Sequence, residues 1–425
     1  MQTPRTGQIP LLDDAPCAQY SRAGDAGGWS AAPACHAAAA VFDGAQRPVL
    51  LAATGDLRAW ARRRLASAPA EWVLHAVQCS CMMEADLAYL GLARRFAPAA
   101  ASLAAERVRA WWACIDPGAE FPEWSKSNLV EGAVAPRSAT RARGGAGGVG
   151  EALGPFADKD SAGRFIEAVI DAFDLCREYR LLVLAPAAQA CAYREMGRCA
   201  APCDGSESME SYRARVRAAV EAVTGGAGAL AGLRGDVERR MRAAAAANEF
   251  ESAAACKAQA ERFSRLAGGA FARVRRLADF RFVLVWRGPR EGWVRIGACR
   301  GGQVAVFGDA AVAAARRSAA GSEGARELAA AARDWAARPA AEWPSGDEVG
   351  PLGVLAREYA APSTRRCAWF VPINPVESAD VWMRGVVDAA AACLRPRTRG
   401  SERVAAGAGR AGAPGGDHEL ELLPE

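Results

Sequence analysis

Residues 231–267 form the longest helical pattern in the chain, and this pattern restricts the fold more than any other feature. Their apolar side chains recur at helical spacing in two stripes, with a possible break at Asn248. The first stripe consists of Leu233, Val237 and Met241, and the second of Ala253, Cys256, Ala260 and Phe263. Two stripes separated by a break predict two antiparallel helices joined by a short turn. One long helix is the alternative.

The rest of the chain divides into several units, because 425 residues exceed what one hydrophobic core usually organises. We expect a multidomain fold of mixed α/β and helical parts. The expected parts are a flexible tail (1–27), a small α/β domain with an extension (28–135), a Gly/Arg-rich linker (136–152), a Cys-rich segment (153–230), the helical hairpin (231–268), a C-terminal α+β domain (269–395) and a disordered tail (396–425).

Two of these parts show alternating or apolar runs that are typical of strands. Residues 37–98 predict the order strand, strand, helix, strand, helix, with turn signals at Gly44 and Pro48 and a helix end near Pro98. From residue 278 onward, three strands separated by glycine-containing turns predict a meander. A helix, a strand at "CAWFVPI" and a last helix near 379–394 follow.

Composition and charge indicate a soluble cytoplasmic protein. The chain is 51% hydrophobic, yet it has no apolar run of the roughly 18 residues that a membrane helix needs. Its N-terminus lacks the pattern of a secretory signal, and 13 cysteines in such a chain are expected to be reduced. The net charge is +5, with Arg-rich runs at 58–64 and 271–276 that could face DNA. A solvated helix face would look the same.

Four cysteines form the strongest candidate site. Cys176, Cys191, Cys199 and Cys203 follow the spacing C-x14-C-x7-C-x3-C. Four thiolates can hold zinc or an iron–sulfur cluster. Structural zinc usually uses short C-x2-4-C knuckles, which this spacing lacks, so a cluster is favoured over zinc. Reduced cysteines that only pack in the core remain the alternative, as they do for Cys79 and Cys81.

This region resembles the middle of the UvrC excinuclease family, which acts in nucleotide excision repair. The resemblance extends over the run "GPFADKDSAGRFIEAVIDAFDLC" and the block "CAYREMGRCAAPCDG". The matching positions are Gly154, Pro155, Phe156, Phe173, Leu175, Cys176, Cys191, Cys199, Pro202, Cys203, Gly205 and Tyr212. The resemblance implies a [4Fe-4S] cluster on the four cysteines, although the gap that follows Cys176 is a few residues longer than is usual in the family.

The hairpin is similar to the UVR motif of the same family. The kernel of that motif corresponds here to Phe250, Glu251, Ala253 and Ala254. Small alanines allow two helices to approach closely, and Phe250 would fill the end of their contact. The resemblance implies that these residues bind a UvrB-like repair protein, whereas an ordinary alanine-rich hairpin is the alternative.

Residues 36–98 are similar to the GIY-YIG nuclease domain with which UvrC proteins begin, and Asp43, Arg47, Leu57 and Arg58 agree with it. The chemically active positions do not agree, because Ala39, Leu50, Trp60 and Tyr89 replace two tyrosines, an arginine and a glutamate. Phosphodiester hydrolysis of this type needs a base, a cation and a metal ligand. The resemblance therefore implies a domain without catalytic residues.

Downstream of residue 270, neither the ribonuclease-H-like domain nor the helix-hairpin-helix units of UvrC are recognisable. Three hypotheses follow. The first is a DNA-repair adaptor or regulator without nuclease activity. The second is a divergent endonuclease whose site has moved to Tyr89, Glu84 and Arg62, or lies in the C-terminal unit. The third is a zinc-stabilised interaction module.

Overall fold

The computed structural model describes most of the chain: residues 17–21, 28–128, 150–311, 323–339, 344–363, 365–373, 378–394 and 417–422. Most of the predicted tails and of the predicted linker 136–152 lies outside these ranges. Within them, no helix combines the length and the apolar character needed to cross a bilayer. The chain forms two compact units, one of Met1–Arg109 with Phe280–Glu425 and the other of Ala110–Asp279.

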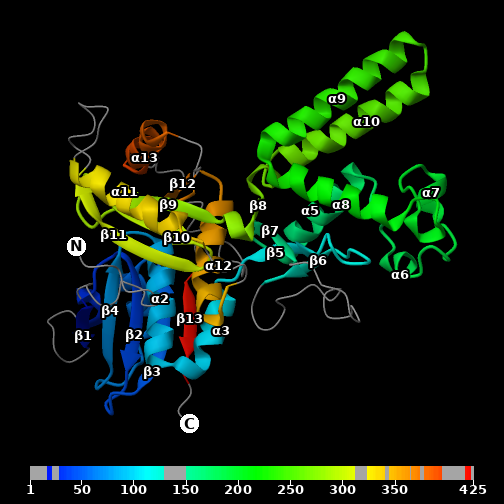
Figure 1. The fold of residues 1–425 in the computed structure, drawn as a ribbon. Coiled ribbons are helices and arrows are strands. Elements are labelled where there is room, and N and C mark those ends of the chain that lie inside the picture. The colour runs from blue at the N-terminus through cyan, green and yellow to red at the C-terminus, as the bar shows by residue number, and fades with distance from the viewer. Residues whose placement is uncertain are drawn as a thin grey trace. The chain divides into compact units, whose positions relative to one another are not determined.

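The first unit contains an antiparallel sheet in the order β1-β4-β2-β3-β13 (Figure 1). Its central elements follow the order that the sequence predicts: β2 (His36–Phe42), β3 (Pro48–Thr54), α1 (Leu57–Arg64), β4 (Val73–Cys79) and α2 (Met82–Phe96). The Asp43 carboxylate closes the β2–β3 turn by accepting the N–H groups of Ala45 and Arg47. Asp56 caps α1 by accepting the N–H of Ala59, which satisfies a donor that the helix leaves unpaired.

Two further strands correct the prediction of structureless tails. β1 (Cys17–Ser21) pairs with β4, and β13 (His418–Glu421) pairs with β3, so each completes one edge of the sheet. Both segments are poor in apolar residues, which is why the sequence predicted disorder there. The ladder bonds at a sheet edge join backbone groups, however, and they do not require apolar side chains.

The first unit also contains the predicted meander. β9 (Arg281–Arg287), β10 (Trp293–Arg300), β11 (Gln303–Ala311) and β12 (Ala368–Pro372) form an antiparallel sheet in the order β11-β10-β9-β12. Helices α11 (Glu323–Ala337) and α13 (Ala379–Cys393) pack on it. Helix α12 (Gly346–Ala360) instead packs against α2 and α3 (Ala101–Arg107). This packing joins the predicted N-terminal and C-terminal parts into one unit.

The second unit is built on a sheet in the order β6-β5-β7-β8. Its strands are β5 (Trp111–Ile115), β6 (Ser125–Ser127), β7 (Glu151–Phe156) and β8 (Arg275–Arg276). Its helices are α5 (Lys159–Ala172), α6 (Tyr179–Leu182), α7 (Ala192–Glu195), α8 (Met209–Thr224), α9 (Gly226–Ala246) and α10 (Phe250–Ala267). Phe165 and Val169 of α5 are fully buried in its core, beside Tyr212 and Val216 of α8. β5 and β6 lie in this sheet, although the sequence assigned them to the preceding domain.

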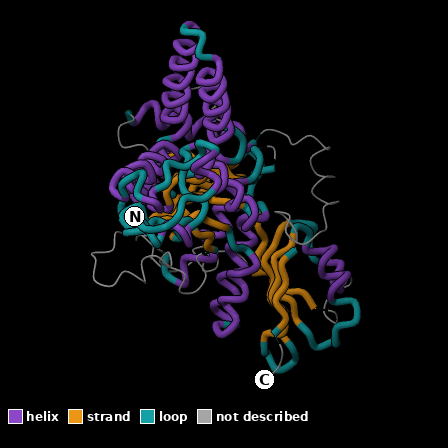
Figure 2. Tube along the Cα trace, turned by 90° about the vertical axis from the view of Figure 1, so that its right-hand side faces the viewer, coloured by secondary structure: helices purple, strands orange, loops and turns teal. Residues whose placement is uncertain are grey.

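The predicted hairpin is confirmed. Helices α9 and α10 pack against each other along their lengths and are joined by a short loop (Figures 1 and 2). Asn248 in this loop has a positive φ of 61°, a conformation that Asn adopts more readily than most residues. One long helix is therefore excluded. Val237, Ala260 and Phe263 are buried where the hairpin meets the core of its unit.

Candidate cysteine site and helical hairpin

The loop that carries Cys199 and Cys203 contains two residues with a positive φ, one on each side of Pro202. Ala201 precedes Pro202 and has a φ of 56°, and Gly205 has a φ of 81°. The left-handed region is uncommon for a residue with a Cβ atom, so the conformation of Ala201 is unusual. Between Ala201 and Gly205, Pro202–Asp204 form a short 3-10 helix. Cys199 and Cys203, on either side of Ala201, are both buried.

Two of the four thiols contact each other directly. A hydrogen bond from Cys176 lowers the pKa of Cys199 to about 6, which favours the thiolate form of Cys199. The backbone N–H of Ala201 also donates to the Cys199 sulfur at 3.4 Å, and the nearby Arg215 lowers the pKa of Cys199 further. The same hydrogen bond raises the pKa of Cys176, because Cys176 supplies the shared proton. The contact therefore favours a thiolate at Cys199 beside a protonated Cys176.

The other two cysteines lie in the same neighbourhood. Burial raises the pKa of Cys203, and the charges of Cys199 and Cys191 raise it further. Across the described ranges, no three His, Cys, Asp or Glu side chains are arranged closely enough to ligate a metal ion. The four thiols thus provide suitable soft donors for a cluster, and they gather in one region without closing into a ligand shell.

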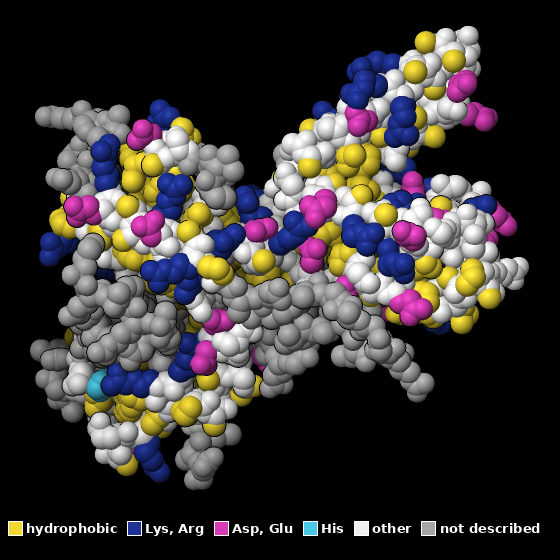
Figure 3. All heavy atoms as spheres, in the orientation of Figure 1, with side chains coloured by type: hydrophobic (Ala, Val, Ile, Leu, Met, Phe, Trp, Pro, Cys, Tyr) yellow, Lys and Arg dark blue, Asp and Glu magenta, His cyan; other side chains and the backbone are white. Residues whose placement is uncertain are grey.

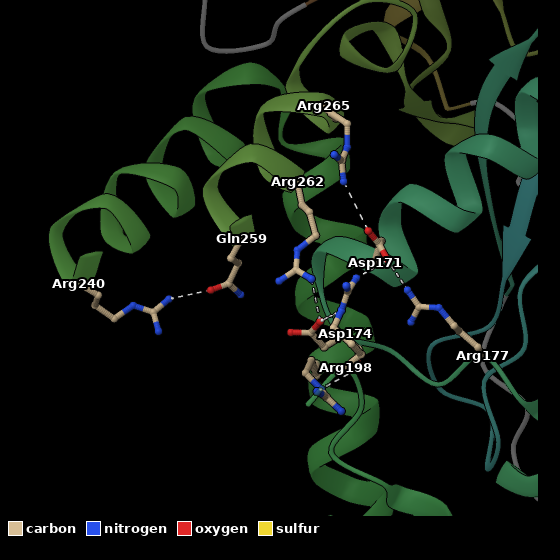
Figure 4. Close-up of polar contacts among 9 residues, drawn as sticks. Asp171, Asp174, Arg177, Arg198, Arg240, Gln259, Arg262 and Arg265 are labelled. Atoms are coloured by element: carbon tan, nitrogen blue, oxygen red, sulfur yellow. Dashed lines mark hydrogen bonds and ion pairs between the residues drawn. The ribbon is translucent and has the colours of Figure 1, made fainter. Parts of the chain in front are cut away.

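A network of ion pairs joins the cysteine segment to the hairpin (Figure 4). Two carboxylates at the end of α5, Asp171 and Asp174, lie among four guanidinium groups. The partners are Arg177 and Arg198 from the cysteine segment and Arg262 and Arg265 from α10. Arg198 bridges both carboxylates, and it immediately precedes Cys199. Partly buried ion pairs therefore link the Cys199 loop to the base of the hairpin.

The tip of the hairpin is open to solvent. Phe250, the first residue of α10, is 69% exposed, which is unusual for so large an aromatic side chain. Glu251 and Ala254 are also exposed, and Ala253 is half-buried. Basic side chains lie along the visible face of the hairpin, with acidic ones near its tip (Figure 3). The four residues of the predicted partner site thus lie together on one accessible end, and their role stays a prediction.

The positions that the resemblance assigns to nuclease catalysis lie inside the first unit. Ala39, Leu50, Trp60 and Tyr89 are each at most 3% exposed. Burial raises the pKa of Tyr89 to about 12, and the Tyr89 hydroxyl has no hydrogen-bond partner among the described residues. The indole N–H of Trp60 donates to Glu419 at 2.8 Å. All four side chains are thus packed in the interior of the unit.

Glu84 and Arg62, two residues of the hypothesised relocated site, differ in their burial. Glu84 is 3% exposed and accepts a hydrogen bond from the Ser80 N–H at 2.8 Å, whereas Arg62 lies on the exposed side of α1. Glu84 forms an ion pair with Arg295, which also binds both carboxylate oxygens of Asp309 at 2.7 and 3.0 Å. No local pattern in the sequence indicates this link, because its partners are 211 residues apart. Glu84 therefore connects α2 to the meander.

Comparison with known proteins assigns the cysteine region. Residues 126–222 match the family described as UvrC/Cho excinuclease, middle domain. The UvrABC system proteins C of two strains of Halobacterium salinarum are each 38% identical to this chain over 105 residues. That match covers 24% of this chain and 17% of the length of each relative. No solved structure matches the chain. The family match includes all four cysteines and ends before α9.

Proposed function

The middle region of this chain belongs to the UvrC family, and from this premise we propose that the protein acts in nucleotide excision repair as a non-nucleolytic adaptor or regulator. The observation that carries the proposal is the contrast between the cysteine region, which matches the family, and the buried, apolar residues at the GIY-YIG positions. An adaptor needs contacts with a partner and with DNA, but it does not need a hydrolytic centre.

The proposed cofactor is a [4Fe-4S] cluster bound by Cys176, Cys191, Cys199 and Cys203. The thiolate character of Cys199 supports it, since the thiolate is the form that binds iron. A cluster there would hold separate turns of the loop together, and the ion pairs of Arg198 would extend this constraint to α10. Iron, sulfide and zinc determined on one anaerobically purified sample should give about four irons per chain. Stoichiometric zinc without iron would support the interaction-module alternative.

The proposed partner is a UvrB-like repair protein that binds the exposed tip of the hairpin. An aromatic side chain that stands in solvent at the end of two packed helices is suited to insert between the helices of another protein. DNA is the proposed second ligand, bound through arginine-rich faces.

The absence of nuclease activity is tested directly. With Mg²⁺ or Mn²⁺, the purified protein should not nick supercoiled plasmid or duplex DNA that carries a lesion, because none of the replaced positions can serve as base, cation or metal ligand. Nicking by the wild type that disappears in Glu84→Gln would contradict the proposal and support a relocated active site. The folded state of Glu84→Gln must be checked in parallel, because Glu84 pairs with Arg295.

A further inference from the structure

The chain's own C-terminal strand completes one edge of a sheet in the first unit. The C-terminal acidic segment, residues 417–422, lies along β3, and the N–H of Leu422 donates to the Val49 carbonyl at 3.0 Å. Side chains of a strand alternate between its two sides. Leu420 is buried and His418 approaches Asp86 of α2 at 3.6 Å. The alternate positions carry Asp417, Glu419 and Glu421.

Every acidic side chain of this segment contacts the basic end of α1. Arg63 Nη2 lies 2.9 Å from a carboxylate oxygen of Asp417. Arg64 Nε lies 3.2 Å from Glu419, and the same guanidinium group also pairs with Glu421. Two adjacent arginines thus bind three carboxylates spaced along an extended backbone.

Two further hydrogen bonds anchor the acids. The Trp60 indole N–H donates to Glu419 at 2.8 Å, and the Gly55 N–H donates to Asp417 at 3.3 Å. Trp60 is the position that the resemblance assigns to a catalytic arginine. The segment therefore covers Trp60 as well as the two arginines at the end of α1.

These contacts can be exchanged for others. The side chains of Asp417 and Glu419 are about one-third exposed, and that of Glu421 is 64% exposed. Exposed ion pairs contribute little to stability and are screened by salt. Guanidinium groups also bind phosphate with the same bidentate geometry that they use for carboxylate. A polyanion could therefore compete for the two guanidinium groups, and full release of the segment also requires the β13 ladder to open and Leu420 to leave its buried position.

We propose that the C-terminal acidic segment masks a phosphate-binding surface formed by Arg63 and Arg64, and that nucleic-acid backbone phosphates compete with it for these two side chains. The first unit then binds DNA when the segment is released from α1. The inference rests on the proposed role in DNA repair only for the identity of the polyanion.

The test neutralises the acids in the full-length chain with Asp417→Asn, Glu419→Gln and Glu421→Gln, which preserve size and the acceptor for Trp60. Binding to a fluorescent DNA duplex is measured by anisotropy at several salt concentrations. We expect binding at least several-fold tighter than wild type. The plot of log K against log salt should be steeper by about 2, because each phosphate contact contributes roughly 0.9. Adding Arg63→Gln and Arg64→Gln to this triple variant should remove the increase in DNA affinity.

A matched control separates masking from net charge. Glu71, Glu106 and Glu327 are exposed acids of the same unit, and their replacement by Gln changes the net charge equally. This control should bind DNA less tightly than the variant of the acidic segment. Equal binding by both triple variants, or a gain that survives loss of Arg63 and Arg64, overturns the proposal.

A second measurement needs no substitution. In the wild type, saturating DNA should accelerate hydrogen exchange at the backbone amides of His418–Glu421, because release of β13 exposes its ladder bonds. Unchanged exchange under saturation overturns the proposal. If no variant binds DNA, the masking inference fails, whereas the repair role is still decided by metal content and capture of a UvrB-like partner.

Discussion

The two units differ in the side chains at their candidate functional positions. In the first unit, the positions that the resemblance assigns to nuclease chemistry hold buried side chains such as Trp60 and Tyr89. In the second unit, the Cys199 sulfur, whose pKa is lowered by Cys176, and the charges of Asp171 and Asp174 lie in and around irregular turns. The candidate cofactor and partner sites thus lie in the second unit, whereas the first unit carries the arginine surface at the end of α1.

The strongest test of this contrast is removal of one thiolate. Cys199→Ser should eliminate bound iron and destabilise the loop, because serine is a poor ligand for iron and does not form the thiolate that Cys176 stabilises. Iron content and thermal unfolding of anaerobically prepared protein are the measurements. Cys256→Ser, at a half-buried position on α10, is the matched control and should retain iron. Equal iron in both variants would show that Cys199 is not a ligand.

The second test concerns the hairpin tip. Phe250→Ala should weaken binding of a UvrB-like partner by roughly thirtyfold or more, since truncating an aromatic anchor costs about 2 kcal/mol. Helical circular dichroism should hardly change, because Phe250 is 69% exposed. Leu103→Ala provides the control, since this side chain is 52% exposed in the other unit. Equal affinities for Phe250→Ala and wild type would make the hairpin a spacer.

The sequence predicted the regular elements better than the contacts between them. Periodicity correctly placed the ββαβα order, the meander and the hairpin with its turn at Asn248, because each depends on neighbouring residues. It missed the edge strand His418–Glu421, whose ladder bonds involve only backbone groups. It also missed the Glu84–Arg295 pair, which forms only when distant segments pack together. The thiol neighbours were recognised through family resemblance, since their spacing alone allowed zinc, a cluster or core packing.

The third test uses a buried acid in the first unit. Burial raises the pKa of Asp86 from 3.8 to about 7, so its folded form favours the protonated state. Its stabilising contribution is complete below about pH 4 and is lost as the pH rises through 7. Asp86→Asn has no carboxyl group at this position and avoids this loss. The free energy of unfolding of the variant relative to that of wild type should therefore increase between pH 5 and pH 8, by an amount on the order of 2 kcal/mol.

Urea unfolding of both proteins at the two pH values measures this difference. Burial lowers the pKa of His418, the neighbour of Asp86, to about 4, and the stability contribution of His418 is therefore lost as the pH falls from about 6.5. Because His418 lies 3.6 Å from Asp86, the difference between wild type and variant reports on Asp86 together with its effect on His418. A pH-independent difference would mean that Asp86 titrates normally and is not desolvated by its burial.

The smallest expected effect lies at Ala201, in the second unit. A left-handed φ costs a residue with a Cβ atom about 1–2 kcal/mol, whereas glycine adopts it freely but loses about 0.5–1 kcal/mol more conformational entropy on folding. Ala201→Gly should therefore stabilise the protein slightly, by about 0.5 kcal/mol. Ala258→Gly, on the exposed side of α10, should destabilise it by about 1 kcal/mol. Urea midpoints that shift in the same direction for both variants would show that Ala201 is unstrained. Opposite shifts would show that the cysteine loop retains local strain, as functional loops often do.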